Sequence, residues 1–263
     1  MSNDHPEPRI FFRKTLSPKN CNVSQAVTDF RKDINDAAEE SPKAAQDALW
    51  FSWREFSKVV AVTKPEEQDY LVQFLGRLRQ DEGQEQKLQV EGEETTLKNL
   101  PLFGSEMRHV WNETPDERGS HELAQAWVNR NAFAARLTAV SKREDCLDYS
   151  LFCIWSIRNA LEDNSPEEKT MSAVLQAAAM WMIYAAGEIH QRAVDGQTYE
   201  GRLAIGGRSV QGKDWKGHSK ERWELWAERL EQKSGTVEDE ETRRLMEEAL
   251  KKMKEVKGTS LDD

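Results

Sequence analysis

Apolar residues recur every three or four positions along most of the chain, which is the pattern of amphipathic α-helices. One segment shows this clearly, with Leu49, Trp53, Phe56 and Val60 on a single face. The pattern predicts successive helices, among them one over about 146–162 and one that ends near Val194. We therefore expect an all-α protein, a single compact domain of about nine helices around a buried central helix.

Local start and stop signals refine these helices. Ser24 is a candidate N-cap, Thr63–Glu66 has the form of a capping box, and Ser165–Glu168 combines a cap, a first-turn proline and an acidic third position. We expect Ser120 and Ser219 to cap the fifth and eighth helices, respectively. Gly196 suits a left-handed residue after a helix.

The helix expected after Ser165 is the candidate centre of the fold. Only Gln176 is polar between Val174 and Ala186, so other helices should surround this segment. Domain boundaries follow from the remaining pattern: an irregular arm at 1–22, a helical domain at 23–234, and a charged C-terminal helix and tail at 235–263.

Two connections lack helical periodicity. Residues 80–97 form a polar excursion in which a short hairpin around Glu91 and Gly92 is possible. Residues 196–217 are rich in glycine, and we expect Gly206 and Gly207 to form a turn there. Weak anion binding by this second connection stays open as an alternative.

Composition and charge narrow the functional classes. The 263 residues carry 37 basic and 47 acidic side chains, a net charge of −10, which disfavours nucleic acid and membrane surfaces as partners. Three cysteines leave at least one thiol unpaired, as in a reducing compartment. The first residues do not form a signal peptide, and the longest apolar run, 177–187, is too short to span a membrane. We expect a cytoplasmic protein.

Four segments within roughly 45–232 have a distinctive sequence: 97–104 with Arg108 and 111–112, 127–138, 149–162, and 215–230. The first contains a Leu-Pro-x-Phe-Gly motif, and the last contains an Arg-Trp-x-x-Trp motif. These segments resemble a fungal (ascomycete) family of uncharacterised helical proteins, recorded as a domain of unknown function. The resemblance implies a helical fold and a fungal origin, and it supplies no mechanism.

Known metal and nucleotide motifs are not complete. The zinc-protease pattern fails because Gln125 stands where its second histidine belongs, and Glu106 and His109 form only one half of a di-iron helix pattern. The glycine-rich stretch 201–217 lacks both phosphate-binding orders. We therefore predict no cofactor and no metal.

The candidate catalytic residues lie at the end of the central helix. Tyr184, Glu188 and Arg192 follow one another at four-residue spacing near His190. The pair Glu188–Arg192 is either an ordinary exposed ion pair or, if buried, a group suited to acid/base work. Arg158, on the apolar stripe of its own helix, is the fourth candidate, with snorkelling or stacking on a tryptophan as the alternative.

The nine tryptophans divide into two predicted sets. Apolar faces place Trp50, Trp53, Trp155 and Trp181 in the core. The candidate ligand-binding set has semi-polar neighbours near helix ends or the glycine-rich connection: Trp111, Trp215, Trp223 and Trp226. These rings could line a groove, or they could be lids that close the domain.

Two functional hypotheses remain open. The first is a non-enzymatic helical protein that binds a protein or small-molecule partner. The second is an enzyme or accessory protein acting on a small organic molecule in a fungal secondary-metabolite pathway. The environment of Glu188 separates them, because an acid/base role requires a lined cavity around that carboxylate.

Overall fold

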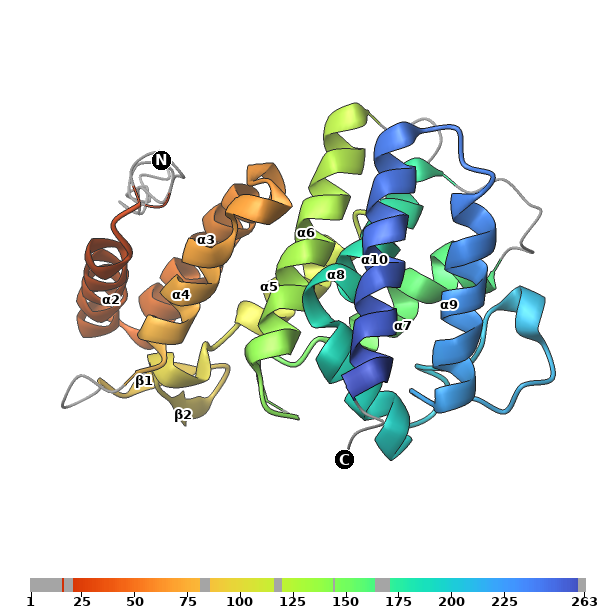
Figure 1. The fold of residues 1–263 in the computed structure, drawn as a ribbon. Helices are drawn as coiled ribbons and strands as arrows, with labels where there is room; N and C mark the ends of the chain where they lie inside the picture. The colour runs from red at the N-terminus through yellow and green to blue at the C-terminus, as the bar shows by residue number, and fades with distance from the viewer. Residues whose placement is uncertain are drawn as a thin grey trace. The chain divides into compact units, whose positions relative to one another are not determined.

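The computed structural model describes residue 16 and residues 21–80, 86–115, 120–143, 145–163 and 171–259. The predicted all-α class is confirmed: the described residues form nine α-helices and one short two-stranded sheet (Figure 1). Close contacts group the chain into two compact units, Met1–Glu113 and Thr114–Asp263. The predicted arm at 1–22 lies mostly outside the described residues.

The first unit contains four α-helices and the sheet. Short 3-10 turns, Pro65–Glu67 and Leu97–Asn99, stand before α4 and α5. The elements are α2 (Val23–Glu40), α3 (Pro42–Val62), α4 (Asp69–Leu78), β1 (Leu88–Val90), β2 (Glu93–Thr95) and α5 (Phe103–Trp111).

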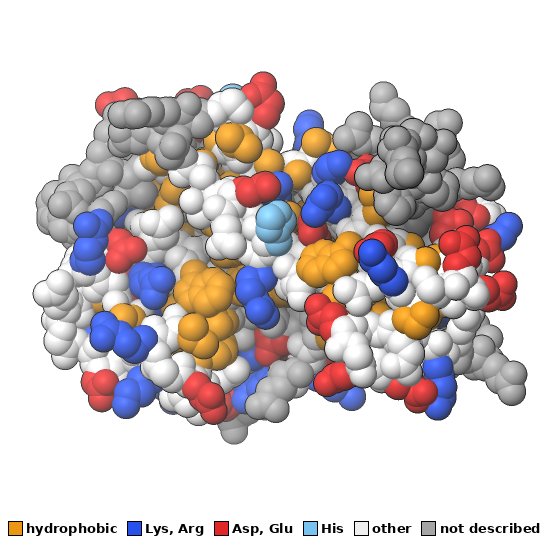
Figure 2. Space-filling view, turned by 180° about the vertical axis from the view of Figure 1, so that it is seen from behind, with side chains coloured by type: hydrophobic (Ala, Val, Ile, Leu, Met, Phe, Trp, Pro, Cys, Tyr) orange, Lys and Arg blue, Asp and Glu red, His pale blue; other side chains and the backbone are white. Residues whose placement is uncertain are grey.

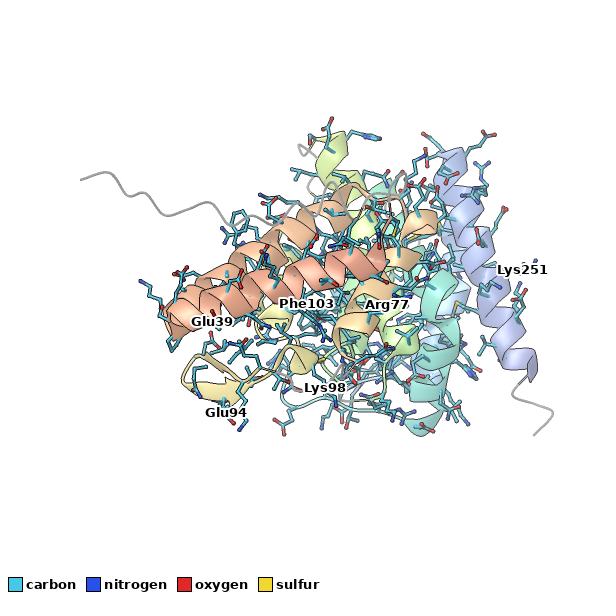
Figure 3. All side chains as sticks on the ribbon, turned by 90° about the vertical axis from the view of Figure 1, so that its left-hand side faces the viewer. Glu39, Arg77, Glu94, Lys98, Phe103 and Lys251 are labelled. Atoms are coloured by element: carbon cyan, nitrogen blue, oxygen red, sulfur yellow. The ribbon has the colours of Figure 1, made fainter. Side chains whose placement is uncertain are left out.

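Aromatic rings form the core of this unit. Trp53 lies 4.8 Å from Phe30 and 5.0 Å from Phe103 between ring centroids. The Trp53 indole also donates to the Pro101 carbonyl at 2.7 Å, so its polar edge is satisfied although the ring is buried. Figure 3 shows Phe103 lying within the unit, whereas Glu94 lies at its surface.

Two predicted caps of the first unit are wrong. Asn22, not Ser24, caps α2, since the Asn22 side chain accepts from the Gln25 amide at 3.0 Å. The Thr63 hydroxyl donates to the Val59 carbonyl of the preceding helix, so it is not available to begin a new one. A 3-10 turn therefore follows, and α4 begins only at Asp69.

The possible hairpin is present. β1 and β2 pair antiparallel, with Val90 opposite Glu93. Glu91 and Gly92 between them have φ values of 53° and 86°, and two successive positive φ angles are characteristic of the tightest hairpin turns.

The second unit is built around one long helix, α8 (Ser172–Asp195). Figure 1 shows α6 and α10 running beside α8, in agreement with the close contacts between these helices. A short π-helix, η3 (Arg158–Glu162), continues α7, and we call it the π-turn. A 3-10 turn, η4 (Arg208–Val210), lies in the connection 196–217, which we call the glycine-rich loop. The other helices are α6 (His121–Val140), α7 (Ser150–Ile157), α9 (Lys220–Ser234) and α10 (Glu240–Thr259).

The prediction of a buried central helix is confirmed by α8, which is buried around most of its circumference. Asn131 of α6 joins it to α7 in the interior, because its side-chain oxygen accepts from the Trp181 indole at 2.8 Å and from the Ser156 hydroxyl at 2.6 Å. Two partners on different helices satisfy this buried amide oxygen.

Two helix starts in the second unit differ from the prediction. α7 begins at Ser150 rather than Cys146, with Tyr149 as its N-cap residue, and the Asp148 carboxylate before it accepts from the Ser150 amide at 3.0 Å. α8 begins at Ser172, whereas the predicted start signal Ser165–Glu168 lies outside the described residues. The caps Ser120 and Ser219 are confirmed.

None of the helices in the described ranges combines the length and apolar character needed to cross a bilayer.

One glycine inside α8 and the glycine that follows this helix provide a matched stability test. Gly196 has φ +65° as predicted, and Gly187 lies inside the helix; a Cβ would meet nothing within 4 Å at either position. Gly187→Ala should stabilise the protein by about 0.5–1 kcal/mol through helix propensity, and Gly196→Ala should destabilise it by about 1 kcal/mol through backbone strain. Urea unfolding of both variants measures the two effects, and equal shifts would contradict the assignment of Gly196.

Candidate functional site

The most enclosed charged group of the second unit is Glu162, at the end of the π-turn. Its side chain and that of Arg222 on α9 are both 0% exposed, and they form a two-pronged ion pair. Arg222 Nε lies 2.7 Å from Glu162 Oε1, and Arg222 Nη2 lies 2.9 Å from Oε2. Parallel bonds of this kind are the strongest form of an arginine–carboxylate contact.

Other groups complete the coordination of this carboxylate. The Trp226 indole donates to Glu162 Oε1 at 2.6 Å, and the Gly207 amide donates to Oε2 at 3.0 Å. We call Glu162, Gly207, Arg222 and Trp226 the Glu162 cluster. Each carboxylate oxygen accepts two hydrogen bonds, so the buried charge is fully solvated by protein groups.

Arg222 also binds the glycine-rich loop. Its Nη1 donates to the carbonyls of Ala204 at 2.7 Å and Gly217 at 2.9 Å. These carbonyls belong to a segment with little regular secondary structure, and buried backbone acceptors need such partners. One guanidinium therefore anchors the loop to α9 at two points, Ala204 and Gly217.

Local sequence explains how the cluster assembles. Arg222, Trp226 and Arg229 follow at spacings of four and three residues, which places them on one face of α9. Arg229 donates to the Leu161 carbonyl and to the Ser209 hydroxyl. The wide π-turn presents Leu161 and Glu162 to this face.

Two glycines allow the backbone to approach closely enough. A Cβ on Gly207 would lie 2.5 Å from the Glu162 carbonyl carbon, and one on Gly217 would lie 1.9 Å from the Gln197 carbonyl oxygen. The turn expected at Gly206 and Gly207 lies instead at 201–204, and Gly207 is an extended residue before η4 that contacts the π-turn. Arg202, Arg208 and Lys213 of this loop are exposed.

The structure brings together two of the predicted catalytic residues. Arg192 is fully buried, and its guanidinium pairs with Glu188 and Asp148, each at 3.0 Å. Arg192 also donates to the Gln197 side chain at 2.7 Å. The Glu188 side chain is 28% exposed, so it is neither buried from solvent nor fully solvated.

The other two predicted catalytic residues have different surroundings. The Tyr184 ring lies under the Arg136 guanidinium, 3.9 Å from its carbon to the ring centroid. Arg158, the first residue of the π-turn, is half-buried and forms no ion pair with any residue in the described ranges. The catalytic roles of all four residues stay predictions.

A group of buried titratable residues was not predicted from the sequence. Burial beside Arg222 and Arg192 lowers the pKa of His218 to about 3. Burial raises the pKa of the Cys153 thiol well above its usual value. Tyr199, whose hydroxyl lies 2.6 Å from that of Ser150, also has a pKa raised by burial. At neutral pH these three groups are therefore uncharged.

The burial of the tryptophans differs from the two predicted sets. Trp53 and Trp181 are core residues as expected, but Trp50 and Trp155 are only half-buried. The candidate ligand-binding residues Trp215, Trp223 and Trp226 are 7%, 3% and 1% exposed, and Trp111 is buried in the first unit. The Trp215 indole donates to Glu221 at 2.9 Å, and the Trp223 ring lies 5.0 Å from that of His190.

Within the described residues, no group of three or more His, Cys, Asp or Glu side chains could hold a metal ion. Glu106, from the half di-iron pattern, is buried and accepts from the Ser57 hydroxyl at 2.9 Å, while His109 is exposed. All three cysteines have free thiols.

Sequence reasoning missed the Glu162–Arg222 pair because its two residues are 60 positions apart. One signal was available: both charged residues lie within the segments that carry the family resemblance. The sequence also places Arg222 four residues before Trp226, so both residues lie on one face of α9.

The fold and the Glu162 cluster define an all-α protein with a loop anchored internally by a buried ion pair. The chain belongs to the family described as "Protein of unknown function (DUF3632)", which matches residues 53–230. This span begins inside α3, ends inside α9 and contains every residue of the Glu162 cluster. No curated protein and no solved structure matches the chain. The expected membership of an uncharacterised family is confirmed, and the fungal origin stays a prediction.

A double-mutant cycle tests the Glu162–Arg222 pair. Glu162→Gln and Arg222→Met should each destabilise the protein by about 3–5 kcal/mol, because each leaves one buried charge without its partner. The double variant should cost clearly less than the sum of the two. Denaturant unfolding measures the cycle, and Lys257→Gln, in an exposed pair with Glu224, should cost below about 1 kcal/mol. Additive single effects would contradict direct coupling.

His218 predicts a pH dependence of stability. Its pKa is about 3 when folded and 6.5 as the ordinary value, so the unfolded chain takes up a proton first as the pH falls. The stability held above pH 6.5 should therefore decline toward pH 3, by up to about 1.4 kcal/mol per pH unit from this group.

The pH dependence is measured as a difference between variants. His218→Gln should have a shallower loss of unfolding free energy between pH 6.5 and pH 4 than the unchanged protein. His109→Gln, at an exposed position, should keep the original slope. Identical slopes for all three proteins would show that His218 does not titrate differently on unfolding.

Proposed function

We propose that this protein acts by binding a protein partner, with the second unit as a rigid binding module. The saturation of the Glu162 carboxylate carries this proposal. Its oxygens accept from Arg222 twice, from the Trp226 indole and from the Gly207 amide. A general base must be free to accept a proton from a substrate, and this carboxylate is occupied by structural partners.

The second buried arginine supports the same conclusion. Arg192 is held by Asp148, Glu188 and Gln197, so its charge is balanced within the unit. Charged groups arranged in this way fix helices and loops relative to one another. A fixed framework favours binding, because less conformational freedom is lost on association.

The proposal gives the predicted ligand-binding tryptophans a supporting role. Trp215 and Trp226 bind Glu221 and Glu162 through their indole nitrogens, and Trp223 packs beside His190. The first of these contacts joins the glycine-rich loop to α9, the second joins α9 to η3, and the third joins α9 to α8. Direct ligand contact by these rings or by Trp111 requires their exposure and stays a prediction.

The enzyme hypothesis has one specific observation in its favour. Glu188 is partly exposed and lies 3.0 Å from the fully buried Arg192 guanidinium, so a solvent-accessible carboxylate stands beside a fixed cation. In this second candidate function, Glu188 acts on a small organic molecule, with Tyr184 four residues before it on α8.

We also propose a cytoplasmic location and a fungal origin. The three free thiols, two of them exposed, are compatible with a reducing compartment. The fungal origin rests on the sequence segments that resemble the ascomycete family.

Native mass spectrometry after purification from the source organism tests the two candidates. The binding proposal predicts a stoichiometric protein partner that is retained by Glu188→Gln. The expected spectrum contains no small-molecule adduct that depends on Glu188. A stoichiometric small molecule without a protein, lost in Glu188→Gln, would overturn the binding proposal and favour the enzyme.

A further inference from the structure

One tryptophan of the second unit reaches the surface in a fixed orientation. Trp155 is half-buried on α7, and its indole donates to the Leu203 carbonyl at 2.8 Å. Its ring stacks on Phe152, with centroids 5.0 Å apart and planes at 21°, and Phe152 in turn contacts Tyr149 at 5.2 Å. The exposed part of the indole is thus held from two sides, as in a binding anchor.

Leu203, whose carbonyl accepts from the Trp155 indole, and two arginines near these residues in the sequence make up the surroundings that we consider. Leu203 is 50% exposed and follows the exposed Arg202 in the loop. Arg158 comes three residues after Trp155, on the same side of the helical segment. We call Trp155, Arg158, Arg202 and Leu203 the Trp155 surface.

Figure 1 draws α7 behind α10. Figure 2, which views the protein from behind, shows hydrophobic side chains at the surface with Lys and Arg side chains beside them.

The two arginines of the Trp155 surface differ from Arg143, Arg192 and Arg222 in their ion pairing. Arg192 and Arg222 are neutralised by buried carboxylates, and the exposed Arg143 pairs with Asp195. Across the described ranges, neither Arg158 nor Arg202 forms an ion pair. Two arginines without an ion pair in the described ranges therefore lie near a half-buried indole in a chain of net charge −10.

We propose that the Trp155 surface docks a short acidic segment of a protein partner. An apolar side chain of the segment packs on Trp155 and Leu203, and its carboxylates pair with Arg158 and Arg202. This inference rests on the proposed binding function and names the chemistry of the partner. We choose an acidic segment because of charge complementarity. Two arginines can pair with two carboxylates that stand on either side of one apolar residue.

Nucleic acid and a second copy of the chain are less suitable occupants. Nucleic acid requires many phosphate contacts, and the Trp155 surface offers two arginines on a strongly acidic protein. A second copy would bring two charges of −10 together. Both occupants are distinguished by the experiment below.

Fluorescence anisotropy with the full-length protein provides the direct test. The probe is a labelled peptide, Ser-Asp-Glu-Leu-Glu-Leu-Asp-Glu-Ser, and two control peptides replace its acids by amides or its leucines by serines. The acidic probe should bind at least tenfold more tightly than either control. Raising the salt concentration should weaken binding, because both ion pairs are at the surface.

Protein variants locate the binding. Arg158→Gln and Arg202→Gln should each weaken the probe about fivefold, the equivalent of about 1 kcal/mol per exposed charge pair. Leu203→Ser should weaken binding of the probe to a similar extent, and this substitution keeps the Leu203 backbone carbonyl in place. Lys216→Gln is the matched control, since Lys216 is an exposed cation of the same loop, and it should change affinity less than twofold. Unchanged urea unfolding excludes loss of folding as the cause.

Several outcomes would overturn the inference. These are equal binding of the amide peptide, no binding of the acidic probe at about 1 mM, or equal affinity in Arg158→Gln and Lys216→Gln. Tighter binding of a nine-nucleotide labelled DNA than of the acidic peptide would indicate nucleic acid instead. A dimer seen by light scattering and lost in Arg158→Gln would indicate a second copy.

Identifying the natural partner distinguishes a failure of this inference from a failure of the proposed function. If native mass spectrometry finds a protein partner that the double variant Arg158→Gln, Arg202→Gln no longer retains, both are supported. A partner retained by the double variant would overturn the Trp155 surface and leave the binding function in place. A small molecule in place of a protein would overturn the binding function itself.

Discussion

The buried ion pair between Arg222 and Glu162 organises the second unit. Removing two charges from water is costly, and the cost is offset here by bidentate geometry and by the Trp226 and Gly207 donors. Arg222 also donates hydrogen bonds to backbone carbonyls of the glycine-rich loop, which has little regular secondary structure. The loop, α9 and the π-turn therefore depend on one another for their positions.

This interaction links the interior to the proposed binding surface. The π-turn begins at half-buried Arg158 and ends at fully buried Glu162, so five residues connect the surface to the cluster. The loop fixed by Arg222 contributes Leu203, whose carbonyl accepts from Trp155. An anchor of this kind holds Trp155 and Leu203 in place before a partner arrives, which reduces the entropy lost on binding.

The sequence predicted the ends of helices well where the capping hydrogen bonds join residues that are close in the sequence. Ser120, Ser219 and Gly196 act as expected because a cap involves residues within one turn. The capping box predicted at Thr63 does not form, because the Thr63 hydroxyl donates to the Val59 carbonyl of the preceding helix. The pair Glu188–Arg192 was also predictable, since four-residue spacing on a helix brings the side chains together.

The sequence by itself determined the all-α class, the central position of α8 and the family, because periodicity and contiguous motifs carry that information. Only the tertiary structure decided the burial of Trp155 and Trp226 and the pairing of Glu162 with Arg222. Trp226 became a core residue through Glu162, 64 positions away, whereas Trp155 became accessible at the edge of α7. Contacts over such separations depend on how helices pack, and neither residue spacing nor composition specifies that packing.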